Sequence, residues 1–237
     1  MPIEYKLEDK IATITFNQPE KLNIFAIDDV HKLSRMFIDF RDDENAWVLI
    51  LTGAGDKAFS AGYDIAGQIP DKYPPLITRG ITIYKPVIAA INGVCMGAAL
   101  DLALACDLRV ASDNAIFADP GVKYGMMSAW GGTQRLPRIV KPTAAAELLL
   151  TAKTIDANQA LRIGLLNRVV PQNDVMTTAV DWANQICELG PLAVRSAKKS
   201  VIKGMSMSLA DGLKLEQELF AKIVESDDTK TTFTRVE

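Results

Sequence analysis

Two short turns rich in glycine and alanine are the first places where this chain could do chemistry. They span residues 58–65 (AFSAGYDI) and 92–101 (NGVCMGAALD), and each lies directly after a predicted buried strand. Small side chains let a ligand approach the backbone, and two N–H groups aimed at one carbonyl oxygen form an oxyanion hole. The N–H of Ala98 is a candidate donor, because backbone donors at the start of a helix lack internal partners. The alternative interpretation is structural, since small residues also allow close packing of a strand on a helix.

One carboxylate lies beside these turns, in the apolar segment 87–106, whose strongly polar members are Asn92 and Asp101. The segment is long enough to cross a membrane, but placing Asp101 in hydrocarbon would cost roughly 2.5 to 3.5 kcal/mol. Asn92 and Gly93 also form a turn dipeptide in its middle. We therefore predict a buried strand over residues 87–91 and a helix over residues 98–106. Asp101 is then a candidate acid or base, or a cap for backbone donors in the first helical turn.

Composition argues against several other kinds of chemistry. The 237 residues include 26 Lys and Arg and 29 Asp and Glu, so the net charge of −3 gives no reason to expect nucleic acid or an anionic membrane as a partner. The single histidine, His31, leaves no room for a Ser-His-Asp triad or a multi-histidine metal site, and we expect it at a surface or interface. The three cysteines have no Cys-x-x-Cys spacing, which favours packed thiols in a reducing compartment. Residues 1–10 carry no apolar stretch of signal-peptide length, so we predict a cytoplasmic protein. Because the chain has a single histidine, we also predict that it binds no metal.

The glycine-rich run at residues 53–58 (GAGDKA) superficially matches a dinucleotide-binding loop. That fingerprint requires a helix to begin within the motif. Here the following residues 57–62 predict another short strand and another turn. A lone glycine motif is weak support, and we do not expect a dinucleotide site.

The elements that would position these residues alternate between strand and helix in the first half of the chain. Strands are predicted over residues 11–16, 47–52, 87–91 and 108–111, and an amphipathic helix over residues 27–40. Such alternation predicts right-handed crossovers and a mainly parallel sheet, with ligand sites at the carboxyl ends of its strands. From residue 143 onward the pattern is helical, with breaks at Gly164, at a short strand or turn over residues 167–170, and at residues 190–191.

Five motifs, in the same order along the chain, resemble those of the crotonase (enoyl-CoA hydratase/isomerase) superfamily. They are residues 17–23 (NQPEKLN), 51–62 (LTGAGDKAFSAG), 85–93 (KPVIAAING), 130–138 (WGGTQRLPR) and 160–170 (ALRIGLLNRVV). The resemblance implies an α/β fold with a spiral core of ββα units over residues 1–171. It also implies a helical C-terminal region, residues 172–237, that packs on the core and on neighbouring subunits of a homotrimer or a dimer of trimers.

The resemblance further implies an acyl-CoA thioester as the substrate, with coenzyme A bound as part of that substrate and no permanent cofactor. The N–H groups of Tyr63 and Ala98 match the positions that hold the thioester carbonyl, so that negative charge can develop as an enolate. Ala61 matches the adenine pocket, and Lys21 matches a position near the CoA phosphates, with a solvated loop lysine as the alternative. The positions expected to bind CoA are Lys21, Ala58, Ala61, Gly62, Asp64, Ile65, Gly97, Pro120 and Gly121.

Hydratases of this superfamily use two glutamates to move protons. The first matches Asp101, which keeps the carboxylate but is shorter by one methylene. The second matches Gly121, which cannot transfer a proton. Asp119 is a possible substitute or an ordinary turn aspartate before Pro120. Naphthoate synthases of the superfamily also carry glycine at the position of Gly121 and can use a bound bicarbonate as the base.

The expected function is therefore that of an enoyl-CoA hydratase. The alternatives are an isomerase that works with one carboxylate, a bicarbonate-assisted enzyme similar to naphthoate synthase, and a non-catalytic CoA-binding or interaction protein of the crotonase fold. The bulky residues Tyr63, Tyr124, Met126, Met127 and Trp130 could line an acyl pocket or pack in the core. Relatives continue beyond the equivalent of residues 225–230 with a helical turn that covers CoA, so we expect some CoA contacts to differ here.

Overall fold

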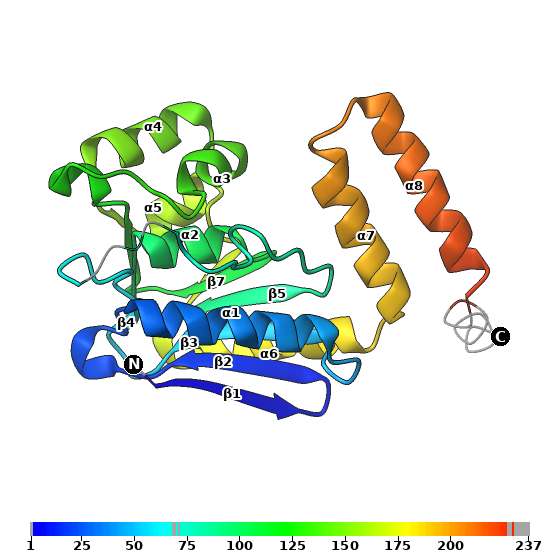
Figure 1. Ribbon diagram of the computed structural model, residues 1–237, viewed down its shortest axis with the longest axis horizontal. Coiled ribbons are helices and arrows are strands. Elements are labelled where there is room, and N and C mark those ends of the chain that lie inside the picture. The colour runs from blue at the N-terminus through cyan, green and yellow to red at the C-terminus, as the bar shows by residue number, and fades with distance from the viewer. Residues whose placement is uncertain (1, 68–69, 71, 227–228, 230–237) are drawn as a thin grey trace.

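The chain alternates between two β-sheets, and this alternation builds the body of the structure. Figure 1 shows the computed structural model, which describes residues 2–67, 70, 72–226 and 229. Between Val48 and Ala118, successive strands enter a six-stranded and a four-stranded sheet in turn. Every two consecutive strands therefore add one strand to the larger sheet and one to the smaller sheet. This arrangement confirms the predicted α/β spiral core.

The larger sheet contains one antiparallel hairpin and is otherwise parallel. Its order is β1 (Ile3–Glu8), β2 (Ile11–Phe16), β3 (Val48–Gly53), β5 (Val87–Ile91), β7 (Leu108–Ser112) and β10 (Arg168–Val170). β1 pairs antiparallel with β2, and every other neighbouring pair in this sheet is parallel. β3 and β5 are buried along their whole length, which explains their nearly continuous apolar sequences.

Two long helices cover the opposite faces of this sheet (Figure 1). In α1 (Ile27–Asp42), Val30, Leu33 and Phe37 recur at three- and four-residue spacing and are buried in the main core with Leu49 and Leu51 of β3. The other face packs on α6 (Val175–Cys187) through Val48, Ile50, Ile88, Ala90, Val110, Val175, Ala179 and Ala183. Because successive strand residues point to opposite faces, β3 serves both cores at once.

The smaller sheet consists of very short strands. Its order is β4 (Ala58–Ser60), β6 (Val94–Met96), β8 (Ile116–Ala118) and β9 (Ile155–Asp156). β4, β6 and β8 are parallel, whereas β9 pairs antiparallel with β8. The carboxyl ends of β4, β6 and β8 therefore lie next to one another at one edge.

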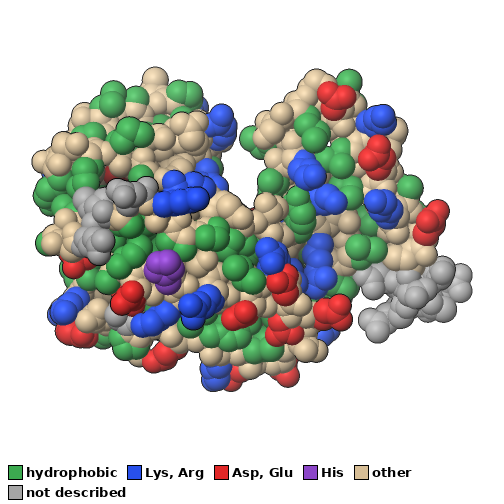
Figure 2. All heavy atoms as spheres, viewed as in Figure 1, with side chains coloured by type: hydrophobic (Ala, Val, Ile, Leu, Met, Phe, Trp, Pro, Cys, Tyr) green, Lys and Arg blue, Asp and Glu red, His purple; other side chains and the backbone are tan. Residues whose placement is uncertain are grey.

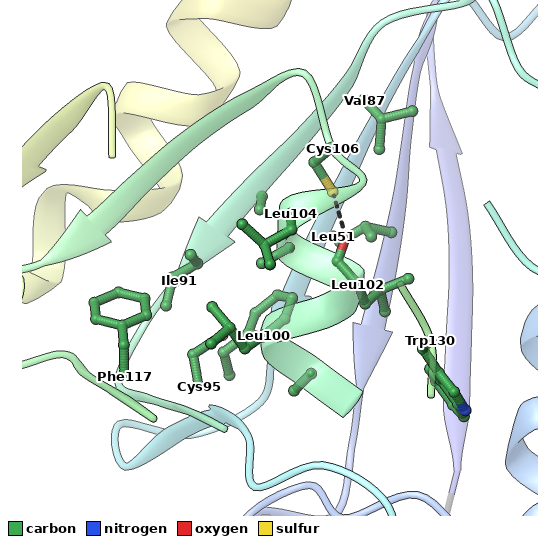
Figure 3. Close-up of a cluster of buried hydrophobic side chains, with 14 of the residues drawn as sticks. Leu51, Val87, Ile91, Cys95, Leu100, Leu102, Leu104, Cys106, Phe117 and Trp130 are labelled. Carbon is green, nitrogen blue, oxygen red and sulfur yellow. Dashed lines mark hydrogen bonds between the residues drawn. The ribbon is translucent and has the colours of Figure 1, made fainter. Parts of the chain in front are cut away.

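The segment that resembles a membrane span is a buried strand–turn–strand–helix unit. It contains β5, β6 and the helix α2 (Ala98–Leu104), and α2 is packed among apolar side chains. Figure 3 shows Leu100, Leu102 and Leu104 of α2 between Cys95, Cys106 and Phe117. Cys106 donates its Sγ–H to the Leu102 carbonyl at 3.4 Å, and burial raises the pKa of this thiol to about 12. Among the described residues, no helix is both long and apolar enough to cross a bilayer.

The described residues form five further α-helices. They are α3 (Gly132–Ile139), α4 (Pro142–Thr151), α5 (Ala157–Arg162), α7 (Pro191–Gly204) and α8 (Leu209–Val224). α7 and α8 form a helical hairpin that stands to one side of the body in Figure 1. Lys198 connects α7 to the body of the structure through two interactions. Its Nζ forms an ion pair with Asp107 Oδ2 at 2.6 Å and donates a hydrogen bond to the Lys85 carbonyl at 2.7 Å.

The sequence identifies the long elements of the chain and misses several short ones. The predicted strands 11–16 and 87–91 match β2 and β5, and β3 and β7 begin or end within one residue of prediction. The helix predicted over residues 27–40 is α1, extended by two residues. β1, β6, β8 and β9 were not predicted, and of these the last three have three residues or fewer. His31 is exposed on α1 (Figure 2).

Candidate active site

Three neighbouring strand ends meet at one cavity of about 730 Å³. Ala61 and Tyr63 follow β4, Gly97 and Ala98 follow β6, and Asp119 follows β8, and all five residues line the cavity. Carboxyl ends of parallel strands are the usual place for a ligand site in an α/β fold. The smaller sheet thus places the two predicted turns and a carboxylate around the same space.

The two glycine-containing turns contact each other directly. Gly62 has φ +97°, and a Cβ added to it would lie 2.6 Å from the Met96 carbonyl oxygen and 3.2 Å from the Ala98 nitrogen. A side chain there would separate the turns, so glycine is required both by conformation and by space. Gly97, with φ +55°, donates its N–H to the Ala118 carbonyl at 3.0 Å and ties the second turn to β8.

The backbone around Tyr63 and Ala98 is fixed by its neighbours. Phe25 donates to the Gly62 carbonyl, and Asp64 donates to the Phe25 carbonyl, each at 2.8 Å, so that the peptide of Tyr63 is held between them. Ala98 is the first residue of α2, and its N–H donates no hydrogen bond to any residue that the structure describes. Ala98 lines the cavity, so this amide is a candidate donor to a ligand oxygen.

Asp101 lies on α2 three residues after Ala98, on the same side of the helix, and it also lines the cavity. Asp101 is 2% exposed to solvent. Oδ2 accepts hydrogen bonds from the Ser128 hydroxyl at 2.6 Å and from the Trp130 N–H at 3.1 Å. Oδ1 is buried and has no hydrogen-bond partner among the residues that the structure describes. Asp101 therefore does not cap its own helix, because both of its donors come from the segment before α3.

Burial raises the pKa of Asp101 to about 6. The Ser128 hydroxyl and the Trp130 N–H oppose this shift because they stabilise the carboxylate, and Arg135 does so as well. The negative charge of Asp119 raises the pKa further. A carboxyl group with such a pKa exchanges protons readily near neutral pH, as an acid–base group must.

Because Gly132 has no side chain, there is room beside it for the side chain of Asp101. A Cβ added at Gly132 would collide with Asp101 Oδ1, and it would lie 2.6 Å from Ser128 Oγ. Gly132 also donates its N–H to Ser128 Oγ at 2.9 Å, which directs the Ser128 hydroxyl proton toward Asp101. The start of α3 thus orients the carboxylate through one serine.

Asp119 faces the cavity and is 5% exposed. Burial raises its pKa, and the hydrogen bond from the Gly121 N–H to Oδ1, at 3.3 Å, opposes the shift. Gly121 also lines the cavity, and a Cβ added to it would lie 3.3 Å from Asp119 Oδ1. The carboxylate of Asp119 therefore lies next to the space that a side chain at Gly121 would enter.

Aromatic rings form one wall of the cavity. The ring centroids of Tyr63 and Tyr73 are 5.4 Å apart, and those of Tyr73 and Trp130 are 5.6 Å apart, both in edge-to-face geometry. Of the other residues predicted for an acyl pocket, Tyr124, Met126 and Met127 also line the cavity. Tyr124 and Met127 are exposed and belong to its rim, whereas Trp130 is buried. An apolar acyl chain or ring would fit against this wall.

Only some of the residues predicted to bind CoA line the cavity. Those that line the cavity are Ala61, Ile65, Gly97, Pro120 and Gly121. Gly62 lies directly behind this lining, and Ala58 is buried in β4, where its carbonyl accepts from Asn23 at 2.8 Å. Asp64 Oδ1 accepts from the Ala66 N–H in a local turn, and Lys21 is exposed at the end of a short 3₁₀ turn, outside the lining. The CoA-binding role of each of these residues stays a prediction.

Ser128, Gly132, Arg135 and Tyr73 are parts of the site that sequence reasoning did not identify. Ser128 and Gly132 lie in or next to the motif at residues 130–138, which was used to identify the superfamily and not to assign roles. A search for hydroxyl donors in the residues just before that motif would have found Ser128. Nothing in the sequence pattern places Tyr73 against Trp130. Among the described residues, no group of three or more His, Cys, Asp or Glu side chains is arranged to hold a metal ion.

Comparisons with known proteins agree on one family. A family model described as enoyl-CoA hydratase/isomerase matches residues 6–237. The chain is 37% identical to a short-chain-enoyl-CoA hydratase of Clostridium acetobutylicum, with 96% of this chain and 91% of that protein covered. It is 36% identical to a crotonyl-CoA hydratase of Syntrophomonas wolfei, with the same coverage. The fold is similar to the crystal structure of an enoyl-CoA hydratase from Bacillus anthracis, with a TM-score of 0.91, 30% identity, and 98% of this chain and 94% of that chain covered.

Proposed function

The chain belongs to the enoyl-CoA hydratase/isomerase family, and from this we propose that it is an enoyl-CoA hydratase, which adds water to the conjugated double bond of a 2-enoyl-CoA. The observation that carries the proposal is the position of Asp101. It is a buried carboxylate with one oxygen that has no partner among the described residues, and it lines the same cavity as Ala98. Hydration requires two groups, and the Asp101 carboxylate and the Ala98 N–H can supply them: a proton acceptor for water and a hydrogen-bond donor to the developing oxyanion.

The thioester carbonyl would bind between the N–H groups of Tyr63 and Ala98. As water adds to the β carbon, the π electrons move toward the thioester, and its oxygen becomes anionic. Preorganised backbone donors stabilise that charge, and removal of one such donor typically costs on the order of 3 kcal/mol of barrier. The contact between the Gly62 and Ala98 turns supports this role, because it holds the two peptides close together without side chains between them.

Asp101 would act as the base on water. Ser128 and Trp130 donate to Oδ2, so we propose as the proton acceptor Oδ1, which is buried and has no partner among the described residues. The hydroxide formed adds to the β carbon, and a protonated carboxyl group of the site then delivers a proton to the α carbon. Water thus adds as H and OH, and we expect syn addition because both groups approach from the same side of the substrate.

The substrate supplies coenzyme A, and no separate cofactor takes part in these steps. The residues at the rim of the cavity, including Tyr124 and Met127, would contact the CoA arm or the acyl group. We further propose that the protein is a cytoplasmic homo-oligomer, a trimer or a dimer of trimers.

The proposal is tested by incubating the protein with crotonyl-CoA and following the loss of the conjugated thioester absorbance, with product identity checked by mass spectrometry. We expect hydration by the native protein and a loss of about 10²- to 10⁴-fold in kcat for Asp101→Asn, with CoA binding retained. The exposed residue Asp181 on α6 provides a matched control, because Asp181→Asn removes a carboxylate far from the cavity. Binding without turnover would contradict the proposal and favour a non-catalytic CoA-binding protein.

Double-bond isomerisation is the second candidate, and Gly121 is the observation that favours it. A single carboxylate can carry one proton between two carbons, so the absence of a carboxylate at Gly121 does not impair an isomerase. Incubation with a 3-enoyl-CoA distinguishes the two activities. Conversion of 3-enoyl-CoA to 2-enoyl-CoA without hydration of crotonyl-CoA would replace the first proposal by the second. A requirement for added bicarbonate would favour the chemistry expected for naphthoate synthases.

A further inference from the structure

The site has one carboxylate whose role the hydration scheme leaves open. Two proton transfers are needed, and Asp101 accounts for the removal of a proton from water. The position that would hold a second carboxylate is Gly121, which has no side chain. Asp119 is the remaining carboxylate among the described residues that line the cavity.

The surroundings of Asp119 differ from those of an ordinary turn aspartate. Turn aspartates lie mostly at the surface, whereas Asp119 is 5% exposed. Its Oδ1 accepts one long hydrogen bond, from the Gly121 N–H at 3.3 Å, and no ion pair to it is present in the part of the chain that the structure describes. Burial of a carboxylate without a cationic partner is costly unless the group is neutral, so Asp119 is suited to carry a proton.

The fold directs Asp119 toward the reacting part of the cavity. Met96 is paired with Ala118 in neighbouring parallel strands, so the residue after each strand, Gly97 and Asp119, lies at the same level. A Cβ added at Gly97 would lie 3.9 Å from Pro120 Cδ, which shows how closely the turns after β6 and β8 approach. Asp119 thus lies beside the turn that presents the Ala98 N–H. Its charge also acts on Asp101, which places the two carboxylates within electrostatic reach.

We propose that Asp119 is the second proton-transferring carboxylate of this site, and that it acts in the space left by the missing side chain at Gly121. The inference rests on the hydratase function proposed above. The Oδ1 atom of Asp119 lies 3.3 Å from the position of a Cβ at Gly121, so a carboxyl group is present in that region although it belongs to a different residue.

The two carboxyl groups divide the proton transfers. Asp101, with two donors on Oδ2, is the carboxylate and removes a proton from water as the C–O bond to the β carbon forms. Asp119 carries the second proton: in its protonated form, its O–H bond breaks as a C–H bond forms at the α carbon. At the end of the reaction Asp101 has gained one proton from water and Asp119 has lost one proton to the α carbon, so transfer of one proton from Asp101 to Asp119 through water restores the starting state.

The test compares Asp119→Asn and Asp119→Glu with the native protein, and Asp181→Asn is the control. With crotonyl-CoA we expect Asp119→Asn to lower kcat by about 10²-fold or more while KM and the affinity for CoA stay within about threefold. We expect Asp119→Glu to retain more activity than Asp119→Asn.

A second variant separates proton transfer from a structural role. Gly121→Glu in the Asp119→Asn background adds a carboxyl group in the same region. We expect the kcat of this double variant to be at least tenfold higher than that of Asp119→Asn, whereas Gly121→Gln in the same background should not raise kcat. Gly121 has no positive φ, and its Cβ would meet its neighbours at 3.3 to 3.4 Å, so small shifts accommodate it.

The outcomes distinguish this inference from the proposed function. Full activity of Asp119→Asn in a protein that hydrates crotonyl-CoA would overturn the inference and leave the hydratase function intact. Loss of CoA binding together with kcat in Asp119→Asn would also overturn it, because the residue would then be structural. A native protein that does not hydrate crotonyl-CoA would overturn both proposals.

Discussion

Asp101 is held in a chemical environment that stability alone would not favour. The residue is almost fully buried, and one of its oxygens has no partner. A buried acceptor without a hydrogen bond typically costs about 1 to 3 kcal/mol, and more when it is charged. Strained or unsatisfied groups of this kind are typical of functional sites, where activity is maintained at the expense of stability.

Asp101→Asn should therefore stabilise the protein in a pH-dependent manner. The pKa of Asp101 is raised from 3.8 to about 6 in the folded protein, so the folded state binds more protons than the unfolded state between these values. The free energy of unfolding consequently falls as pH rises from about 4 to about 6, by about 3 kcal/mol for the full shift. Denaturant unfolding at several pH values should show that Asp101→Asn is more stable than the native protein above pH 6 and that the gain disappears near pH 4. Equal stability of the two proteins at pH 7 would contradict this prediction.

Ser128→Ala should change the pH dependence of activity. The Ser128 hydroxyl lowers the pKa of Asp101, and its removal should raise that pKa further above about 6. Because Asp101 acts as a base, activity requires its charged form, and the acidic limb of kcat/KM should move to higher pH. Trp130, Arg135 and Asp119 also act on Asp101, and the substitution leaves all three in place. An unchanged acidic limb with lower kcat would indicate that the serine acts in another way.

The sequence identifies Asp101 because a carboxylate in an apolar segment requires an explanation. It does not identify Ser128, which contacts Asp101 across 27 residues through a single hydroxyl. The same limit applies to Asp119. Its position next to Pro120 predicts an ordinary turn as readily as a site residue, and the direction of its side chain depends on the pairing of β6 with β8.

At the scale of elements, the site depends on the close approach of α2 to the start of α3. Gly132 is the residue that allows it, since a Cβ there would enter the space of Asp101 Oδ1. Other glycines of the site, such as Gly62, allow two turns to contact each other in the same way. The glycine positions are visible in the sequence, but which backbone or side chain approaches each one becomes clear only in the fold.

Gly132→Ala should displace the Asp101 carboxylate and lower activity strongly. We expect a loss of at least about 10²-fold in kcat on crotonyl-CoA, because small misplacements of a catalytic group have effects of this size. Gly204→Ala on α7 is a suitable control, since a Cβ there would meet nothing within 4 Å, and it should leave kcat unchanged. Thermal unfolding of both variants checks that the fold is retained. Native activity in a folded Gly132→Ala protein would show that Asp101 does not need its present position.

The long strands and α1 could be predicted because their apolar residues follow regular periods. Of the smaller sheet, β4 was predicted as a short strand within residues 57–62, but β6, β8 and β9 were not, since two or three residues are too few to show a period. These short strands are nevertheless the elements that place Tyr63, Ala98 and Asp119 at one edge. The cavity therefore lies at the carboxyl ends of parallel strands, where the sequence predicts a ligand site, although most of the strands concerned were not predicted.

At the scale of the whole molecule, the hairpin of α7 and α8 contrasts with the body. One residue of each helix is buried, Ser196 in α7 and Leu219 in α8. Large apolar side chains on the hairpin are exposed, including Met205 at 69%, Leu209 at 80% and Phe220 at 65%. Figure 2 shows hydrophobic side chains between the charged ones over this part of the surface. The difference from relatives that the sequence predicts follows residues 225–230, and residues 227–228 and 230–237 are outside the described part of the chain.

Exposed apolar residues in such numbers indicate a surface that is covered in the functional protein, and the proposed homo-oligomer would cover it. The native protein should therefore elute with a mass that is a multiple of the 25.8 kDa chain when size-exclusion chromatography is combined with light scattering. Phe220→Glu places a charge among apolar residues and should shift the population toward 25.8 kDa. Gln217→Glu adds the same charge at an exposed polar position of α8 and should leave the mass unchanged. A native protein that is monomeric at micromolar concentration would contradict the prediction, because nothing would then cover this face in solution.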